Sequence, residues 1–333
     1  MMDATASLEM LNSAQKLAET GRHAAVVEQL GVLPVQELEQ SPTLALLFGI
    51  AQARLGRHSS GRQWVATALD TARTRGDGEI EARALNVSGA IAFEEGWIDE
   101  AASCFTRALA VAEGQGDRAT VGRCSNNLGI ISNLRGQYGR AVGSLTMALA
   151  AFQQVGHRAG AAETLHNLAI TYRDQQDLNK ALETEDRALQ EAMAAGDVGL
   201  TAKIQGGRAE IRLLAGDAEV ARLEIQRALA THREVGDVVG ETDDLRVLAG
   251  ALECLSQPAQ AETTLRDVIA RATSLSRPRL AAQAQRDLAR LLHRQGRDDE
   301  AEGYARRARD AYEKLGAVIE VRRLEELLTQ LKV

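Results

Sequence analysis

The chain has 333 residues, of which 45% are hydrophobic and 26% are charged, and its formal net charge at pH 7 is −7. This balance is typical of a folded protein and excludes a disordered chain. The acidic excess argues against a general nucleic-acid binder, which needs basic residues to neutralise phosphates. Abundant Ala and Leu, with only 4 prolines, favour helices.

No segment of the sequence suggests export or a membrane span. The start, MMDATASLEMLNSAQ, lacks the basic and apolar regions of a signal peptide, and the longest apolar run, LALLFGIA, is too short to cross a bilayer. Cys104, Cys124 and Cys254 are far apart and have no nearby metal-ligand pattern, so we expect reduced packing residues. We therefore expect a cytoplasmic protein with no membrane partner, metal or cofactor.

The sequence repeats itself every forty residues. One series of turn residues comprises Gly56, Gly96, Gly136, Gln176, Gly216, Ser256 and Gly296. A second comprises Gly76, Gly116, Gly156, Gly196, Gly236, Ser276 and Gly316. Glycine supplies the left-handed backbone that ends a helix, so two series twenty residues apart predict two helices in each repeat.

The predicted elements follow in chain order. Residues 1–40 form a looser helical pair that turns at Gly21. Seven repeats then occupy 41–76, 77–116, 117–156, 157–196, 197–236, 237–276 and 277–316. Residues 317–333 form a capping helix with an apolar stripe and a charged face. Because one hairpin cannot bury both of its apolar stripes, the seventeen helices should stack into a solenoid without a linker or a second domain.

Small residues recur on the second helix of each repeat. Alanine stands five and twelve residues after the first turn in nearly every repeat, as at Ala141 and Ala148. These positions predict close helix crossings, because larger side chains would force the backbones apart. Asp77, Asp117, Asp197 and Asp237 follow the second turn and should cap the next helix.

The segments NLGIISNLRGQYGRAVGSLTMALAAF and NLAITYRDQQDLNKALETEDRALQEA resemble tetratricopeptide repeats. The period is similar to that of kinesin light chains, of polarity scaffolds and of bacterial regulators with sensor arrays. The resemblance implies an all-α, right-handed superhelix of about eight hairpins plus the capping helix. It also implies that the first helix of each hairpin lines a concave groove that holds a protein or peptide partner.

Transferred to this sequence, the resemblance places a set of polar residues on the groove wall. The candidate peptide-binding residues are Arg83, Asn86, Arg123, Asn126, Asn127, Asn133, His166, Asn167, Arg173, Lys203, Arg286, Arg290, His293 and Arg294. Acidic residues such as Asp174, Glu210 and Asp287 fall on the same wall. Asn127 and Asn167 are equivalent and could satisfy the backbone of an extended peptide, because an amide both donates and accepts. Alternatively, each Asn bonds a neighbouring helix or faces water.

Arg286, Arg290 and Arg294 recur every four residues and predict a basic stripe along one helix. Three interpretations stay open for this stripe. It could be a solvated face with local ion pairs, a docking point for an acidic tail or phosphopeptide, or a nucleic-acid contact. The last is disfavoured because few aromatic residues are available for stacking.

No nucleotide-binding, metalloprotease or nucleophile-elbow motif occurs, so we expect no enzymatic activity and no catalytic residue. The leading hypothesis is a scaffold that binds an extended peptide or a partner helix in its groove. The alternatives are a sensor array that responds to a signalling peptide or small ligand, and an array that assembles into homo-oligomers.

Overall fold

The computed structural model describes residues 4–331, and these form eighteen α-helices and no strand. Three helices come first: α1 (Ala4–Glu19), α2 (His23–Leu30) and α3 (Val35–Gln40). The short α3 is one helix more than the sequence analysis expected. It begins directly after Pro34, and its Leu38 is buried.

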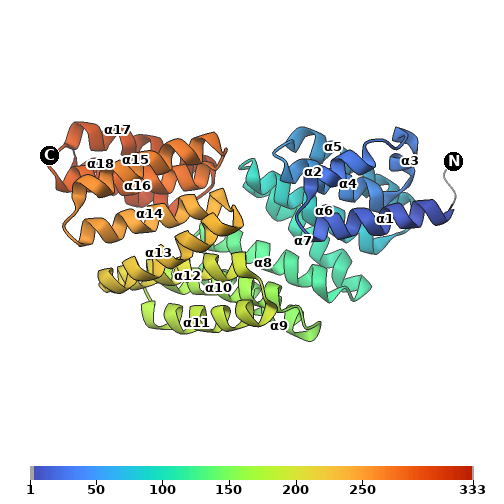
Figure 1. The fold of residues 1–333 in the computed structure, drawn as a ribbon, viewed down its shortest axis with the longest axis horizontal. Coiled ribbons are helices and arrows are strands. Elements are labelled where there is room, and N and C mark those ends of the chain that lie inside the picture. Colours follow the sequence, from blue (N-terminus) through green and yellow to red (C-terminus); the bar gives the residue numbers. More distant parts are fainter. Residues whose placement is uncertain (1–3, 332–333) are drawn as a thin grey trace. The chain divides into compact units, whose positions relative to one another are not determined.

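Helical hairpins follow along the rest of the described chain (Figure 1). The first helices of the hairpins are α4 (Pro42–Arg54), α6 (Gly78–Glu94), α8 (Arg118–Leu134), α10 (Arg158–Asp174), α12 (Val198–Leu214), α14 (Val238–Cys254) and α16 (Pro278–Arg294). The second helices are α5 (His58–Arg75), α7 (Ile98–Gln115), α9 (Tyr138–Gln154), α11 (Leu178–Ala195), α13 (Ala218–Val235), α15 (Pro258–Ser274) and α17 (Asp298–Lys314). The last helix is α18 (Val318–Gln330).

The chain divides into two compact units between Leu128 and Gly129, inside α8. Unit 1 holds α1 to α7 and most of α8. Unit 2 holds the last turns of α8 and the helices α9 to α18. Each unit is an α-solenoid of stacked hairpins, and each is described by itself.

The predicted turn residues adopt left-handed backbone conformations. Every glycine of the two series has a positive φ, as does Gly21. Gln176, Ser256 and Ser276 replace glycine in the pattern and still adopt φ values of 66°, 60° and 53°. The turn geometry is therefore kept even where the side chain makes it unfavourable.

Side chains cap the following helices as the sequence predicted. The carboxylates of Asp77, Asp117 and Asp197 accept hydrogen bonds from the backbone N–H three residues later, at 2.9–3.0 Å. His157 does the same through Nδ1, which accepts from the Gly160 N–H at 2.8 Å. The sequence analysis missed this cap because histidine is not a typical capping residue.

The repeated alanines lie at the helix crossings. Ala101, Ala141, Ala181, Ala221 and Ala301 are all fully buried. Residue 129 of α8 is a glycine. A side chain in its place would stand 2.6 Å from Leu145 of α9, which lies one turn beyond Ala141. Small residues on both helices thus let α8 and α9 approach closely.

The first helices face the inner side of unit 2. Each of α10, α12 and α14 packs against the first helix of the next repeat as well as against its own hairpin partner. The second helices α11, α13 and α15 do not pack against one another to the same extent. An array whose first helices approach each other more closely curves toward them, so these helices form its concave wall.

The helix α18 returns to the beginning of unit 2. Leu134, at the end of α8, packs against the apolar cluster that contains Leu324 and Leu327 of α18. At the adjacent turn, a side chain on Gly136 would stand 2.6 Å from the side chain of Ile319. The helix α18 therefore touches the first turn of unit 2 in addition to covering the last hairpin, a contact that the sequence analysis did not foresee.

Within residues 4–331, no helix is long and apolar enough to span a membrane.

Candidate functional site

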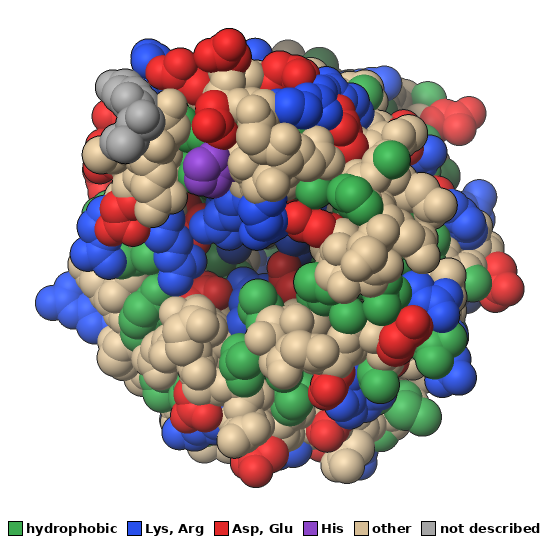
Figure 2. Space-filling view, turned by 90° about the vertical axis from the view of Figure 1, so that its left-hand side faces the viewer, with side chains coloured by type: hydrophobic (Ala, Val, Ile, Leu, Met, Phe, Trp, Pro, Cys, Tyr) green, Lys and Arg blue, Asp and Glu red, His purple; other side chains and the backbone are tan. Residues whose placement is uncertain are grey.

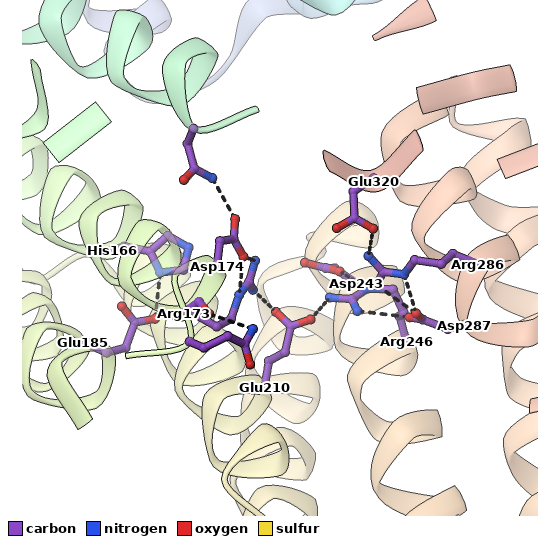
Figure 3. A network of polar contacts seen from close by, with 12 residues as sticks. His166, Arg173, Asp174, Glu185, Glu210, Asp243, Arg246, Arg286, Asp287 and Glu320 are labelled. Atoms are coloured by element: carbon purple, nitrogen blue, oxygen red, sulfur yellow. Dashed lines mark hydrogen bonds and ion pairs between the residues drawn. The ribbon is translucent and has the colours of Figure 1, made fainter. Parts of the chain in front are cut away.

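A chain of linked polar side chains runs along the concave wall of unit 2 (Figure 3). It begins on α8, where Asn133 Nδ2 donates to Asp174 of α10 at 2.8 Å. On α10, Arg173 pairs with Asp174 and with Glu210 of α12. On α14, Arg246 binds the other oxygen of Glu210 at 2.8 Å.

The same chain continues to the last helix. Arg246 also pairs with Asp287 of α16 at 3.4 Å. Asp287 pairs with its neighbour Arg286, which in turn donates to Glu320 of α18 at 2.8 Å. Glu320 binds Arg323 one turn further along α18, at 2.6 Å. Side chains from five consecutive first helices and from α18 are thus joined in one network, which we call the polar ladder.

The ladder is partly withdrawn from solvent, and its charges stabilise one another. The Arg246 side chain is 5% exposed, and those of Arg173 and Glu210 are 15% and 18% exposed. Burial by itself raises the pKa of Glu210, but Arg173 and Arg246 outweigh that effect and hold the pKa well below its usual range. Burial likewise favours the neutral form of Arg246, whereas Glu210, Asp243 and Asp287 raise its pKa well above the ordinary value.

Two buried histidine–carboxylate pairs flank the middle of α12. His166 Nδ1 lies 2.7 Å from Glu185 of α11, and His232 Nδ1 lies 2.7 Å from Asp244. Burial raises the pKa of Asp244 to about 6, although the hydrogen bond from His232 opposes this effect.

These two pairs explain the adjacent glycines of α12. A side chain on Gly207 would collide with Glu185 and would stand 2.6 Å from His166 Cε1. A side chain on Gly206 would stand 2.6 Å from Asp244 Oδ1. Glycine is unfavourable in a helix interior, but here it makes room for two buried carboxylates. His166, predicted on the groove wall, is buried and faces α11.

The candidates of unit 1 contact one another rather than standing apart. Asn127 Nδ2 donates to Asn86 Oδ1 at 3.2 Å, and the same oxygen lies 3.5 Å from Cys124 Sγ. Asn126 is buried. Each of the two remaining candidates contacts its own helix: Arg83 pairs with Glu79, and Arg123 lies 3.5 Å from Thr120 Oγ1.

The remaining candidates of unit 2 lie along the same wall. Lys203 pairs with Glu163 at 3.4 Å, and His293 Nδ1 lies 2.7 Å from Asp298. Arg294 pairs with Glu253 at 2.6 Å. Asn167 is half-buried on α10. Figure 2 shows Lys and Arg side chains, with Asp and Glu side chains among them, on the face that carries the C-terminal helices.

The sequence analysis did not include Glu210, Arg246, Asp287 and Glu320 among the site residues, although they carry most of the ladder. A signal was available in the sequence. Opposite charges recur roughly one repeat apart on the predicted wall, from Arg173 to Glu210 and from Glu210 to Arg246. Charges at such spacing on adjacent helices of a solenoid meet across the helix interface.

The repeats also match models of a known family. The model described as tetratricopeptide repeat matches residues 120–191, and a second model with the same description matches residues 281–315. The chain therefore contains tetratricopeptide repeats. No curated protein sequence matches it.

Solved structures share the fold of this tetratricopeptide-repeat protein at low sequence identity. One is a Rap protein complexed with Competence and Sporulation Factor, with a TM-score of 0.66, 13% identity and 99% coverage of both chains. Another is the Rap conjugation gene regulator of plasmid pLS20 in complex with the Phr* peptide, with a TM-score of 0.59 and 15% identity, covering 97% of this chain and 95% of the other. A third is the apo quorum sensor NprR from B. thuringiensis, with a TM-score of 0.56 and 14% identity, covering 99% of this chain and all of the other.

The described part of this tetratricopeptide-repeat protein offers binding groups along a wall. Its two buried histidine–carboxylate pairs lie at helix interfaces, with histidine side chains 6% and 1% exposed, where a substrate has no access. Among residues 4–331, no group of His, Cys, Asp and Glu side chains is arranged to hold a metal ion. The chemistry that the wall supports is hydrogen bonding and ion pairing.

Proposed function

We propose that this protein is a non-catalytic interaction protein that binds an extended peptide, or a helix of a partner protein, along the inner face of its first helices. The polar ladder is the observation that carries the proposal. It places carboxylates, guanidinium groups and an amide from five first helices and from α18 on one wall of unit 2. A peptide backbone offers a donor and an acceptor at every residue, and a wall of this kind can satisfy both along its length.

The similar solved structures support the same proposal, because a Rap regulator of this fold is in complex with a peptide. In unit 2, Asn133 and Asn167 provide half-buried amides on neighbouring first helices. In unit 1, Asn127 and Asn86 provide a second amide pair. These amides are the groups that we assign to the ligand backbone.

A second candidate function is a peptide-responsive sensor. The ladder favours it because each ion pair joins one repeat to the next. A ligand that competes for Glu210 or Asp287 would change the attraction between adjacent repeats, and with it the curvature of unit 2. Such a ligand shifts the population of two states only if it binds one of them better.

The test starts from peptides of random sequence displayed on phage and selected on the whole protein. Dissociation constants of the enriched peptides would be measured by calorimetry for the wild type and for the double variant Asn127→Ala/Asn167→Ala. The matched control is Arg222→Ala on the second helix α13, whose side chain pairs with the exposed Glu219. We expect the double variant to lose about tenfold or more in affinity, since each hydrogen bond contributes roughly 0.5–1.5 kcal/mol.

Equal affinity of wild type and double variant, with a loss in the control, would move the binding site to the outer helices and contradict the proposal. Small-angle scattering with an enriched peptide separates the two candidate functions. A scaffold keeps its radius of gyration on binding, and a sensor changes it.

A further inference from the structure

The three arginines of the stripe on α16 differ in their pairing. Arg286 pairs with Asp287 and Glu320, and Arg294 pairs with Glu253. Arg290 lies between them on the same helix face, and within residues 4–331 it makes neither a hydrogen bond nor an ion pair. The central cation of the stripe therefore has no counter-ion in contact.

The carboxylates nearest to Arg290 are already engaged by other arginines. Asp287 accepts from Arg286 and lies 3.4 Å from Arg246. Glu320 accepts from Arg286 at 2.8 Å and from Arg323 at 2.6 Å. The group formed by α16 and α18 at this point thus has one cation more than it has anions.

Arg290 is also partly removed from water. Its side chain is half-buried, and burial lowers its pKa, an effect that Arg286 reinforces. A cation held in such surroundings without a partner costs stability. The equivalent positions of earlier repeats hold Ile170, Glu210 and Gly250, so a cation at this position is particular to the last repeat.

We propose that Arg290, next to Arg286 on the same helix face, binds an anionic group of the peptide ligand at the inner face of α16. The group is a carboxylate, either from an acidic side chain or from the free C-terminus. The inference rests on the proposed peptide binding and adds the chemical class and the position of one anchor.

Defined peptide pools provide the test. Hexapeptide pools would carry Glu, Gln or Lys at one fixed position, and each pool would be made both with a free C-terminal carboxylate and as the C-terminal amide. We expect the wild type to retain the anionic pools at least about tenfold better than the neutral ones, as a charge-assisted hydrogen bond allows. A preference for Glu over Gln identifies a side-chain carboxylate, and a preference for the free acid over the amide identifies the C-terminus.

Two variants locate the effect. Arg290→Gln should abolish the preference, whereas Arg294→Gln, one turn away on the same face, should keep it. If the wild type binds anionic and neutral pools equally, or if both arginine variants lose the preference alike, the anion site is refuted while peptide binding stands.

A direct titration covers the case in which no pool binds and the proposed function itself fails. Inorganic phosphate would be added at constant ionic strength while the arginine Nε–Hε resonances are followed by NMR, with Arg290 and Arg294 assigned from the two variants. Saturable shifts confined to Arg290 and its neighbours support the anion site. Shifts that are linear, or equal at Arg290 and Arg294, overturn it.

Discussion

The guanidinium group of Arg246 lies 2.8 Å from the carboxylate of Glu210, although the two residues belong to consecutive repeats. The contact joins α14 to α12 on the concave wall and continues through Arg246 to Asp287 on α16. A single side chain thus links three repeats. Removal of this side chain should therefore destabilise the contacts of the adjacent repeats as well as those of α14.

We expect Arg246→Gln to destabilise the protein by about 3–5 kcal/mol, because it leaves buried carboxylates without their partner. Urea denaturation followed by circular dichroism would measure the change. The control is Arg222→Gln, since the Arg222–Glu219 pair is solvent-exposed and should contribute less than about 1 kcal/mol. A loss no larger than in the control would show that the ladder does not contribute to stability.

The opposite sign is expected for Arg290→Gln. The unpaired cation is disfavoured by burial and by Arg286, so its removal should leave the protein equally stable or more stable by up to about 1 kcal/mol. Differential scanning calorimetry would detect the shift in melting temperature. A clear loss of stability would mean that Arg290 has a structural partner.

Glu210 should make the free energy of unfolding depend on pH. Its pKa is lower in the folded state than in the unfolded state, so its carboxylate contributes stability that is complete above the ordinary pKa of 4.5 and is lost as the pH falls below it. Between pH 6 and pH 3, the free energy of unfolding should therefore decline more steeply in the wild type than in Glu210→Gln. Parallel curves for the two proteins would contradict the assignment.

A comparison of glycines in α12 and α9 tests whether packing or helix propensity decides the effect of an added methyl group. Gly207→Ala should destabilise by roughly 1–3 kcal/mol, because the added methyl group would collide with Glu185 and His166. In α9, Gly143 has open space around it, so Gly143→Ala should stabilise by about 0.5–1 kcal/mol. Denaturation midpoints of the two variants should move in opposite directions. A shift of both toward higher stability would show that α12 has room for the methyl group.

Replacing a non-glycine turn residue by glycine should stabilise the protein. Ser256 and Gln176 adopt left-handed backbone conformations at φ 60° and 66°, which cost roughly 1–2 kcal/mol in residues other than glycine. Ser256→Gly should raise the melting temperature, although added flexibility of the unfolded chain reduces the gain. A lower melting temperature would indicate that the serine side chain stabilises the turn.

The sequence predicted those features of the fold that depend on local chemistry. Gly136 and its equivalents need no neighbour to adopt a left-handed turn, and Asp77 or Asp197 can cap only the helix that follows. The buried alanines could be predicted for a related reason, since each hairpin repeats the same helix crossing. These features recur with a fixed period, so the amino-acid sequence alone shows the pattern.

The site could be predicted only in part. Placing Arg173 and Arg286 on the inner wall was within reach of the repeat pattern, but their partners depend on side-chain conformations and on helix-to-helix offsets. His166 illustrates the limit. The pattern placed it on the wall, and the space above Gly207 directs it into the hairpin instead. The unpaired state of Arg290 was equally out of reach, because it results from the use of Asp287 and Glu320 by other residues.

The return of α18 to the turn at Gly136 has a consequence for how unit 2 folds and unfolds. In an open array each terminal repeat has one neighbour and frays independently of the centre. Here Ile319 rests on the turn at the opposite end of the unit, so neither end is left without a contact. That contact forms only after the helices between have assembled, and its large separation in sequence should slow folding. Unit 2 is therefore expected to unfold in one cooperative step, with its terminal helices exchanging amide hydrogens nearly as slowly as its centre.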